Sequence, residues 1–212
     1  MAESSFYYDG SLCIACRGCQ VACKQWNNLP AEKTQFFAEA GGYQNPADLS
    51  PTTWTLIKFH ETYDKAKGVD WQFRRHHCFH CTDAACIEAC PVDPKAMTRH
   101  PEFGTVFVNQ ELCIGCGACE EACPYGVPHV NEDTEKSYKC TGCRDRVAEG
   151  LLPACAKTCP TNAIRYGSKK EMYALAKERV KELKKMGFKD ANLYGLEQLG
   201  GLRSIYVLPA KL

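Results

Sequence analysis

The chain has 212 residues, of which 45% are hydrophobic, enough to bury a core in one domain or two small ones. Its 26 basic and 25 acidic residues give a formal charge of +1, which indicates neither nucleic-acid binding nor attraction to an anionic membrane surface. No stretch approaches the roughly 18 apolar residues of a membrane helix, and the N-terminus has no leader pattern. We therefore expect a soluble protein without a signal peptide of its own, either cytoplasmic or exported with a partner.

The first part of the chain predicts short regular segments separated by loops. Residues 5–8 predict a short strand, and residues 20–27 predict a helical turn. Residues 28–52 are rich in Pro, Gly and Asn and predict a loop. Residues 53–61 have the composition of a strand.

The second part predicts a strand at 104–109, within a short hairpin, and a closing strand at 163–166. Ser168 and Glu171 form a capping-box pattern that predicts the start of a helix. Residues 204–208 predict a last strand. One face of the predicted helix is apolar and consists of Met172, Leu175, Ala176, Val180, Leu183 and Met186.

Sixteen cysteines fall into four groups of four, with none left over. Two groups share the spacing C-x2-C-x2-C-x3-C, namely Cys13, Cys16, Cys19 and Cys23, and then Cys113, Cys116, Cys119 and Cys123. The other two have four and eleven residues in the middle gap, namely Cys78, Cys81, Cys86 and Cys90, and then Cys140, Cys143, Cys155 and Cys159. Proline follows the last cysteine in every group except the first.

This spacing is typical of bacterial [4Fe–4S] ligation, in which the fourth thiolate of a run binds the other cluster of a pair. Sixteen thiolates at four per cluster predict four [4Fe–4S] clusters. A disulfide framework is the first alternative, but it belongs to chains too small to bury a core, and cysteines two residues apart bridge poorly. Zinc is the second, but a zinc site takes two ligands from each of two knuckles, so the third cysteine of a run would be surplus.

The short link between the second and third groups is that of a two-cluster module, so their last cysteines should be exchanged. The first and fourth groups then pair by elimination. The resulting ligand sets, numbered from here on, are the first set (Cys13, Cys16, Cys19, Cys159), the second set (Cys23, Cys140, Cys143, Cys155), the third set (Cys78, Cys81, Cys86, Cys123) and the fourth set (Cys90, Cys113, Cys116, Cys119).

Other polar residues near the cysteines have simpler interpretations. His76, His77 and His80 surround the second group, but its four positions are already cysteine, so we expect these rings to pack or hydrogen-bond. No phosphate loop and no nucleophile–base or paired-carboxylate set is recognisable, so we predict no catalytic site. Six basic residues beside the motifs either raise cluster potentials or are ordinary surface charges: Arg17, Lys24, Lys139, Arg144, Arg146 and Lys157.

The order of the four groups resembles the four-cluster ferredoxin-like subunits of molybdopterin and tungstopterin oxidoreductases. Within that family, residues 13–27 look most like the beta subunit of formate dehydrogenases. The resemblance implies an α+β fold of two ferredoxin-like modules, with inserted β segments and a C-terminal helix. It implies a tandem cluster region at 1–166, with an inner module at about 70–127 and an outer module at 5–27 plus 128–166. Residues 167–212 would be a lid or a docking segment.

The resemblance further implies a non-catalytic electron-transfer subunit. It would form a heterodimer with a large Mo- or W-bis-pterin subunit that oxidises formate, receive electrons at the first set, and pass them to a soluble acceptor such as a multihaem cytochrome c. Because membrane-bound relatives carry a C-terminal transmembrane helix, the likeness is to soluble periplasmic enzymes exported through the partner's twin-arginine signal. Three alternatives stay open: a subunit of a polysulfide, thiosulfate or nitrite reductase, a free polyferredoxin, and a cytoplasmic location.

Overall fold

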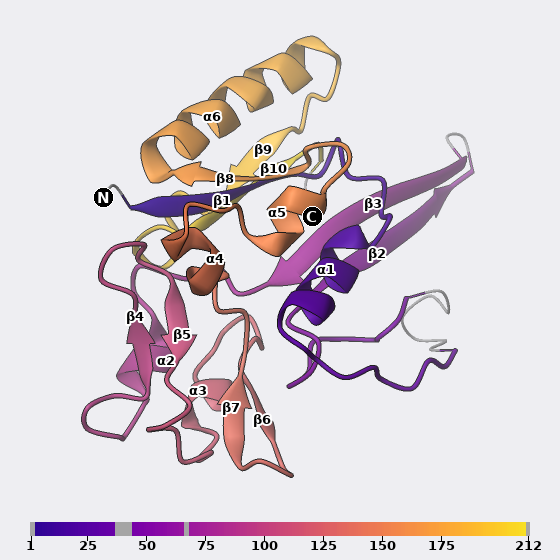
Figure 1. Ribbon diagram of the computed structural model, residues 1–212. Helices are drawn as coiled ribbons and strands as arrows, with labels where there is room; N and C mark the ends of the chain where they lie inside the picture. The colour runs from indigo at the N-terminus through magenta and orange to yellow at the C-terminus, as the bar shows by residue number, and fades with distance from the viewer. Residues whose placement is uncertain (1–2, 37–43, 66–67, 211–212) are drawn as a thin grey trace.

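The centre of the molecule is a four-stranded sheet that joins the two ends of the chain. The computed structural model describes residues 3–36, 44–65 and 68–210 (Figure 1). The sheet has the order β8-β1-β10-β9, with β1 parallel to β10 and antiparallel to β8. Its strands are β1 (Ser4–Asp9), β8 (Ile164–Ser168), β9 (Asn192–Tyr194) and β10 (Ser204–Leu208). The strands predicted at 5–8, 163–166 and 204–208 are thus confirmed.

Strand β1 is buried along its whole length because the sheet is covered on both faces. Side chains alternate between the faces of a strand. Tyr7 belongs to the apolar cluster beneath the C-terminal helix, whereas Phe6 and Tyr8 belong to the cluster that includes Cys19 and Cys155. The sheet therefore separates a helical layer from the layer that holds cysteines (Figure 1).

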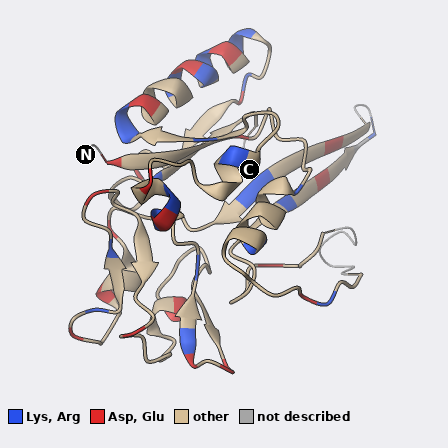
Figure 2. Cartoon of the chain, viewed as in Figure 1, with Lys and Arg blue, Asp and Glu red and all other residues tan. Residues whose placement is uncertain are grey.

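The C-terminal helix α6 (Lys169–Lys185) lies on the outer face of this sheet (Figure 1). The capping prediction is confirmed, because the backbone N–H of Glu171 donates to Ser168 Oγ over 3.3 Å. The apolar face packs as predicted, with Ala176 and Leu183 fully buried. Met186 is the exception at 65% exposure, since it follows the last helical residue as the C-cap. Lys and Glu alternate on the solvent side (Figure 2).

A long hairpin extends from the sheet and consists of β2 (Thr55–Asp64) and β3 (Gly68–His77) (Figure 1). The strands are antiparallel, and Thr55 lies opposite His77 at the inner end. The sequence predicted β2 but not β3, because the last four residues of β3 are charged or histidine. Those residues are nevertheless at the buried end of the hairpin, where Arg75 and His77 are 1% and 0% exposed.

The cysteines are carried by short helices and small hairpins. The hairpins are β4–β5 (Met97–Arg99, Val106–Val108), as predicted, and β6–β7 (His129–Asn131, Lys136–Tyr138), which was not predicted. The helices are α1 (Gly18–Trp26), α2 (Ala85–Glu88), α3 (Ala118–Glu121), α4 (Arg144–Ala148) and α5 (Ala154–Thr158), with a 3-10 turn η2 (Gln198–Gly200). Helix α1 confirms the turn predicted at 20–27.

The predicted loop at 28–52 has no helix or strand in its described part, and residues 37–43 of it lie outside the described residues. None of the helices within 3–36, 44–65 and 68–210 is long and apolar enough to cross a membrane. The mixture of short helices and strands confirms the α+β class. The division at residue 166 stays a prediction, although β10 from the C-terminal part pairs directly with β1.

Candidate metal centres

Three of the four predicted cysteine sets each surround a cavity. The first set lines one cavity, the third set lines a second and the fourth set lines a third. Four sulfurs at each cavity fit a repeated cofactor of one kind.

The second set is buried throughout and comes together where α1 packs beside α5. Burial, and then the negative charges of Cys140, Cys155 and Cys143, raise the pKa of Cys23. Those three thiols are therefore the electrostatic neighbours of Cys23, although they lie more than a hundred residues away in sequence. Three sets line cavities as the nested pairing groups them. The pairing as a whole and the ligation itself stay predictions.

The sulfurs are not arranged for disulfides or for single metal ions. All sixteen cysteines are free thiols. A zinc ion holds its sulfurs about 2.3 Å from the metal, which draws them tightly together. Within the part of the chain that the structure describes, no three His, Cys, Asp or Glu side chains converge closely enough to hold one ion. Four sulfurs around a larger cavity fit a polynuclear cluster instead.

The two tight cysteine loops have the same backbone conformation. Ala15 and Arg17 have φ of 52° and 58°, and the equivalent Gly115 and Gly117 have φ of 66° and 79°. Left-handed residues within a tight turn aim successive N–H groups into one concavity, which attracts an anion. In the first loop this conformation is adopted by residues other than glycine, at about 1–2 kcal/mol each. Such strain fits a loop that wraps an anionic cluster.

Hydrogen-bond donors also point at the sulfurs. The amides of His80, Ser137, Gly142 and Ile164 lie 3.3–3.4 Å from Cys78, Cys113, Cys140 and Cys159, respectively. Side chains add to these amides, because Ser137 Oγ lies 3.3 Å from Cys119 Sγ and Asn27 Nδ2 lies 3.6 Å from Cys23 Sγ. Donors of this kind stabilise the thiolate form over the thiol.

Burial works in the opposite direction. It raises the pKa of Cys19, Cys81, Cys86 and Cys140 to about 12. Buried thiols of this kind would remain protonated at neutral pH, whereas thiolates are the ligands that metals take. A bound iron core supplies the positive charge that keeps such ligands ionised. The donor set and the burial therefore fit a cluster better than free thiols.

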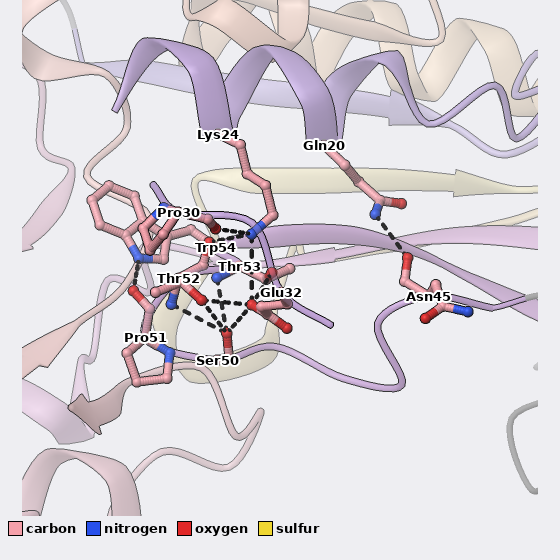
Figure 3. Close-up of polar contacts among 10 residues, drawn as sticks. All are labelled: Gln20, Lys24, Pro30, Glu32, Asn45, Ser50, Pro51, Thr52, Thr53 and Trp54. Carbon is pink, nitrogen blue, oxygen red and sulfur yellow. Dashed lines mark hydrogen bonds and ion pairs between the residues drawn. The ribbon is translucent and has the colours of Figure 1, made fainter. Parts of the chain in front are cut away.

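The loop that follows α1 is held against that helix by a polar network that includes Lys24 (Figure 3). Glu32 Oε1 accepts hydrogen bonds from the hydroxyls of Ser50 and Thr52, each over 2.6 Å, and from Thr53. Lys24 Nζ donates to the carbonyls of Pro30 and Thr52 over 3.1 and 2.8 Å. The network fixes the end of α1 that carries Cys23.

The three histidines pack and hydrogen-bond, as expected. His76 Nε2 contacts the carbonyl of Tyr125 at 3.0 Å, and His77 Nε2 contacts Ser204 Oγ at 2.8 Å. The Nδ1 atom of His80 lies 3.1 Å from the carbonyl oxygen of Val106. Each ring therefore has a hydrogen-bond partner of its own.

Consecutive sets lie beside one another, in the order of their numbers. Cys19 of the first set and Cys155 of the second belong to one apolar cluster. Cys140 of the second set and Cys78 of the third share another, and Cys86 of the third set and Cys119 of the fourth share a further one. After burial, these neighbours also raise the pKa of Cys19, Cys140 and Cys86.

Sequence reasoning missed one residue of the site, Arg75. Its guanidinium Nη2 lies 3.1 Å from Cys155 Sγ, eighty positions away in the chain. The Arg-Arg-His-His run before Cys78 was visible, but no spacing rule connects it to the last cysteine group. Of the six basic residues singled out, Lys139 is buried against sulfur, while Arg144 and Arg146 lie over the rings of Phe107 and Trp26.

Comparison with known families agrees with this geometry. Two overlapping family models, each for a 4Fe-4S dicluster domain, match residues 69–169 and 12–94. The fold and the cysteine sets thus define a ferredoxin-like protein that binds [4Fe–4S] clusters and transfers electrons.

Similar proteins indicate which family of this class the chain resembles. The nitrate-inducible formate dehydrogenase iron–sulfur subunit of Escherichia coli K12 is 44% identical over 98% of this chain, which spans 68% of that protein. The formate dehydrogenase iron–sulfur subunit of Haemophilus influenzae is 42% identical over 94%, and this chain spans 62% of it. Formate dehydrogenase 2 subunit beta (cytochrome c-553) of Nitratidesulfovibrio vulgaris is 36% identical over 92%, with 90% of that protein spanned.

The chain belongs to the family of formate dehydrogenase iron–sulfur subunits. Members of this family are the electron-transfer subunits of an oxidoreductase complex.

Proposed function

We propose that the chain holds four [4Fe–4S] clusters, one in each cysteine set, and relays electrons along the row from the first set to the fourth. The observation that carries this proposal is the linear order of four four-cysteine sets. Each bound cluster would accept and release one electron at a time. The protein holds the sulfurs, excludes water from the middle of the row and places donors at the thiolates.

The two ends of the row reach the surface. Cys16 of the first set and Cys116 of the fourth set are exposed, whereas every cysteine of the second set is buried. In the third set Cys78 is buried and the others are half-buried. Electrons can therefore be exchanged with other proteins at the first and fourth sets, while the second and third sets connect them internally.

The surface at the first set suits a permanent subunit contact. Residues 10–30 contain no Asp or Glu, and Ile14 and Val21 of this segment are 61% and 57% exposed. Obligate interfaces are apolar and depleted in charge. We propose that the large Mo- or W-bis-pterin subunit docks here. Its oxidation of formate yields carbon dioxide, a proton and two electrons, which pass singly into this chain. The formate in the names of the relatives supports this substrate.

The surface at the fourth set suits a transient basic partner. Exposed carboxylates lie on the lobe of α3 and the β6–β7 hairpin, near the cysteine loop in sequence (Figure 2). They belong to Glu111, Glu121, Glu132, Asp133 and Glu135. Complementary charge steers a soluble partner and speeds its association. We propose that a cytochrome c, such as a multihaem one, takes electrons here, and the cytochrome c-553 in the name of one relative supports this choice.

We propose that the complex works in the periplasm, carried there by an export signal on the catalytic subunit. The resemblance to soluble two-subunit formate dehydrogenases supports this location. Cell fractionation with and without the partner gene tests it: the chain should move to the cytoplasmic fraction when the partner is missing. Equal periplasmic amounts in both strains would contradict the proposal.

Purification of the native complex tests the function. The chain should elute with a pterin-containing subunit, and formate should bleach the broad visible absorption of its clusters. Reduction of the cytochrome by the complex should slow steeply as the salt concentration rises, because salt screens the attraction between the oppositely charged surfaces. A chain that elutes alone with reversible clusters would instead indicate a free polyferredoxin. Bleaching by another donor, with no response to formate, would indicate a different terminal enzyme.

A further inference from the structure

Two cations are buried in the middle of the row without an acidic partner. Arg75 is 1% exposed and Lys139 is 3% exposed. Within the described residues neither forms an ion pair with Asp or Glu. By contrast, Arg203, which is equally buried, pairs with Glu3 over 2.6 Å. An unpaired buried charge is strongly destabilising, so anions for Arg75 and Lys139 must come from elsewhere.

The neighbours of Arg75 are the sulfurs of the second set. Its Nη2 donates to Cys155 Sγ over 3.1 Å, and its Nε donates to Thr55 Oγ1 over 3.1 Å. Its remaining nitrogen, Nη1, is buried and finds no hydrogen-bond partner among the described residues. One donor is therefore left for a group that is not part of the polypeptide.

Arg75 keeps its charge at this position. An arginine guanidinium stays protonated throughout the physiological pH range. Its Nη2 lies 3.1 Å from Cys155 Sγ, a member of the second set. The guanidinium is therefore a permanent positive charge at this set.

Lys139 has the same relation to the third set. Its Nζ lies 3.6 Å from Cys78 Sγ and donates to the carbonyls of Val106 and, over 3.1 Å, Cys140. Lys139 also lines the same cavity as two further members of that set, Cys86 and Cys123. It thus stands between the second and third sets.

The two cations lie at the two sets that have no exposed cysteine. An oxidised cluster with four thiolates carries a charge of about −2, and each added electron makes it more negative. At the first and fourth sets an exposed cysteine lets solvent stabilise that charge. The second and third sets have no exposed cysteine. In a medium of low dielectric constant, an added electron there needs a nearby fixed cation.

We propose that Arg75 and Lys139 are fixed positive charges that raise the reduction potentials of the two inner clusters, the second and the third. Electrons can then cross the buried middle of the chain. The inference rests on the four-cluster relay proposed above. It predicts that each cation acts mainly on one cluster, Arg75 on the second and Lys139 on the third.

The test is a potentiometric titration of the native complex, followed by electron paramagnetic resonance, for Arg75→Met and Lys139→Met. Each variant should lower one inner potential, and not the same one. Loss of a charged hydrogen bond to sulfur should lower the equilibrium constant for reduction of that cluster about tenfold or more. For one electron, each factor of ten corresponds to about 59 mV. The matched control is Lys181→Gln, which removes an equal charge from an exposed position on α6.

Unchanged potentials in both methionine variants, with full iron content, would overturn the proposal. If Arg75→Met binds less iron, Arg75→Lys decides, because it keeps the charge and changes the shape. Iron restored by Arg75→Lys supports an electrostatic role, and iron lost again shows that Arg75 acts through packing. The iron content of the wild-type chain is measured before any variant is compared. A wild-type chain with only about eight irons would show that the four-cluster function itself is wrong.

Discussion

Two neighbouring glycines of one cysteine loop allow a sharp test of the fourth set. Gly115 and Gly117 flank Cys116 and both have positive φ. A Cβ atom on Gly115 would lie 2.3 Å from the carbonyl oxygen of Glu135, in the turn of the β6–β7 hairpin. A Cβ atom on Gly117 would meet nothing within 4 Å. Comparing the two alanine variants therefore separates the stability cost of steric overlap from the cost of the backbone conformation.

The expected magnitudes differ for this reason. Gly117→Ala should cost about 1–2 kcal/mol, which is the penalty of a left-handed alanine. Gly115→Ala carries the same penalty, and its Cβ would also be about 1.1 Å inside the 3.4 Å at which ordinary contact begins. Because backbone atoms must move to relieve this overlap, about 1–3 kcal/mol more is expected. Each kcal/mol lowers Tm by about 2–4 °C in a chain of this length.

The assay combines thermal unfolding of the holo-protein with iron analysis. Gly117→Ala should lower the apparent Tm by a few degrees and keep all its iron. Gly115→Ala should lower it roughly twice as much and lose the iron of one cluster, the one at the fourth set. The reasoning is refuted if Gly115→Ala retains full iron and shifts Tm no more than Gly117→Ala does.

Four further variants test other parts of the structure by the same unfolding assay. Leu183→Ala should cost about 2–5 kcal/mol, because Leu183 on α6 is fully buried against the sheet. Met186→Ala, at an exposed site, should change little, and equal losses would contradict the packing described. Ser168→Ala should cost about 1 kcal/mol by removing the helix cap, and an unchanged Tm would show that the cap does not contribute to stability. Burial raises the pKa of Glu32, but its hydroxyl donors and Lys24 bring it below the ordinary 4.5, so the ionised form stabilises the fold above that pH. The Tm deficit of Glu32→Gln should accordingly be constant above about pH 5 and shrink below 4.5; a deficit independent of pH would be evidence against the network.

The cysteine spacing could predict ligand sets because ligation by short runs is a local property, and these sets stay a prediction. A run such as Cys13, Cys16 and Cys19 can wrap one cluster only through its own loop, so spacing alone carries the information. The exchange of last cysteines was also predictable for the two inner groups. The strands at 5–8 and 204–208 were found from composition, but nothing in the sequence indicated that they pair in parallel.

The parts that escaped prediction depend on contacts across the chain. Strand β3 ends in Arg75 and His77, residues that composition assigns to the surface, yet here they are buried beside cysteines. Arg75 is stabilised there by Cys155 Sγ and His77 by Ser204 Oγ, both from distant segments. Single-sequence patterns do not contain that information. The β6–β7 hairpin was missed for a related reason, since its three-residue strands are too short to show a period.

The content of iron and acid-labile sulfide in the native protein tests the central claim most directly. Four [4Fe–4S] clusters predict about sixteen iron atoms and about sixteen sulfides per chain, with four separate one-electron midpoints in a redox titration. Eight or fewer irons in an intact, fully occupied sample, or a colourless sample that contains zinc, would contradict the relay of four clusters.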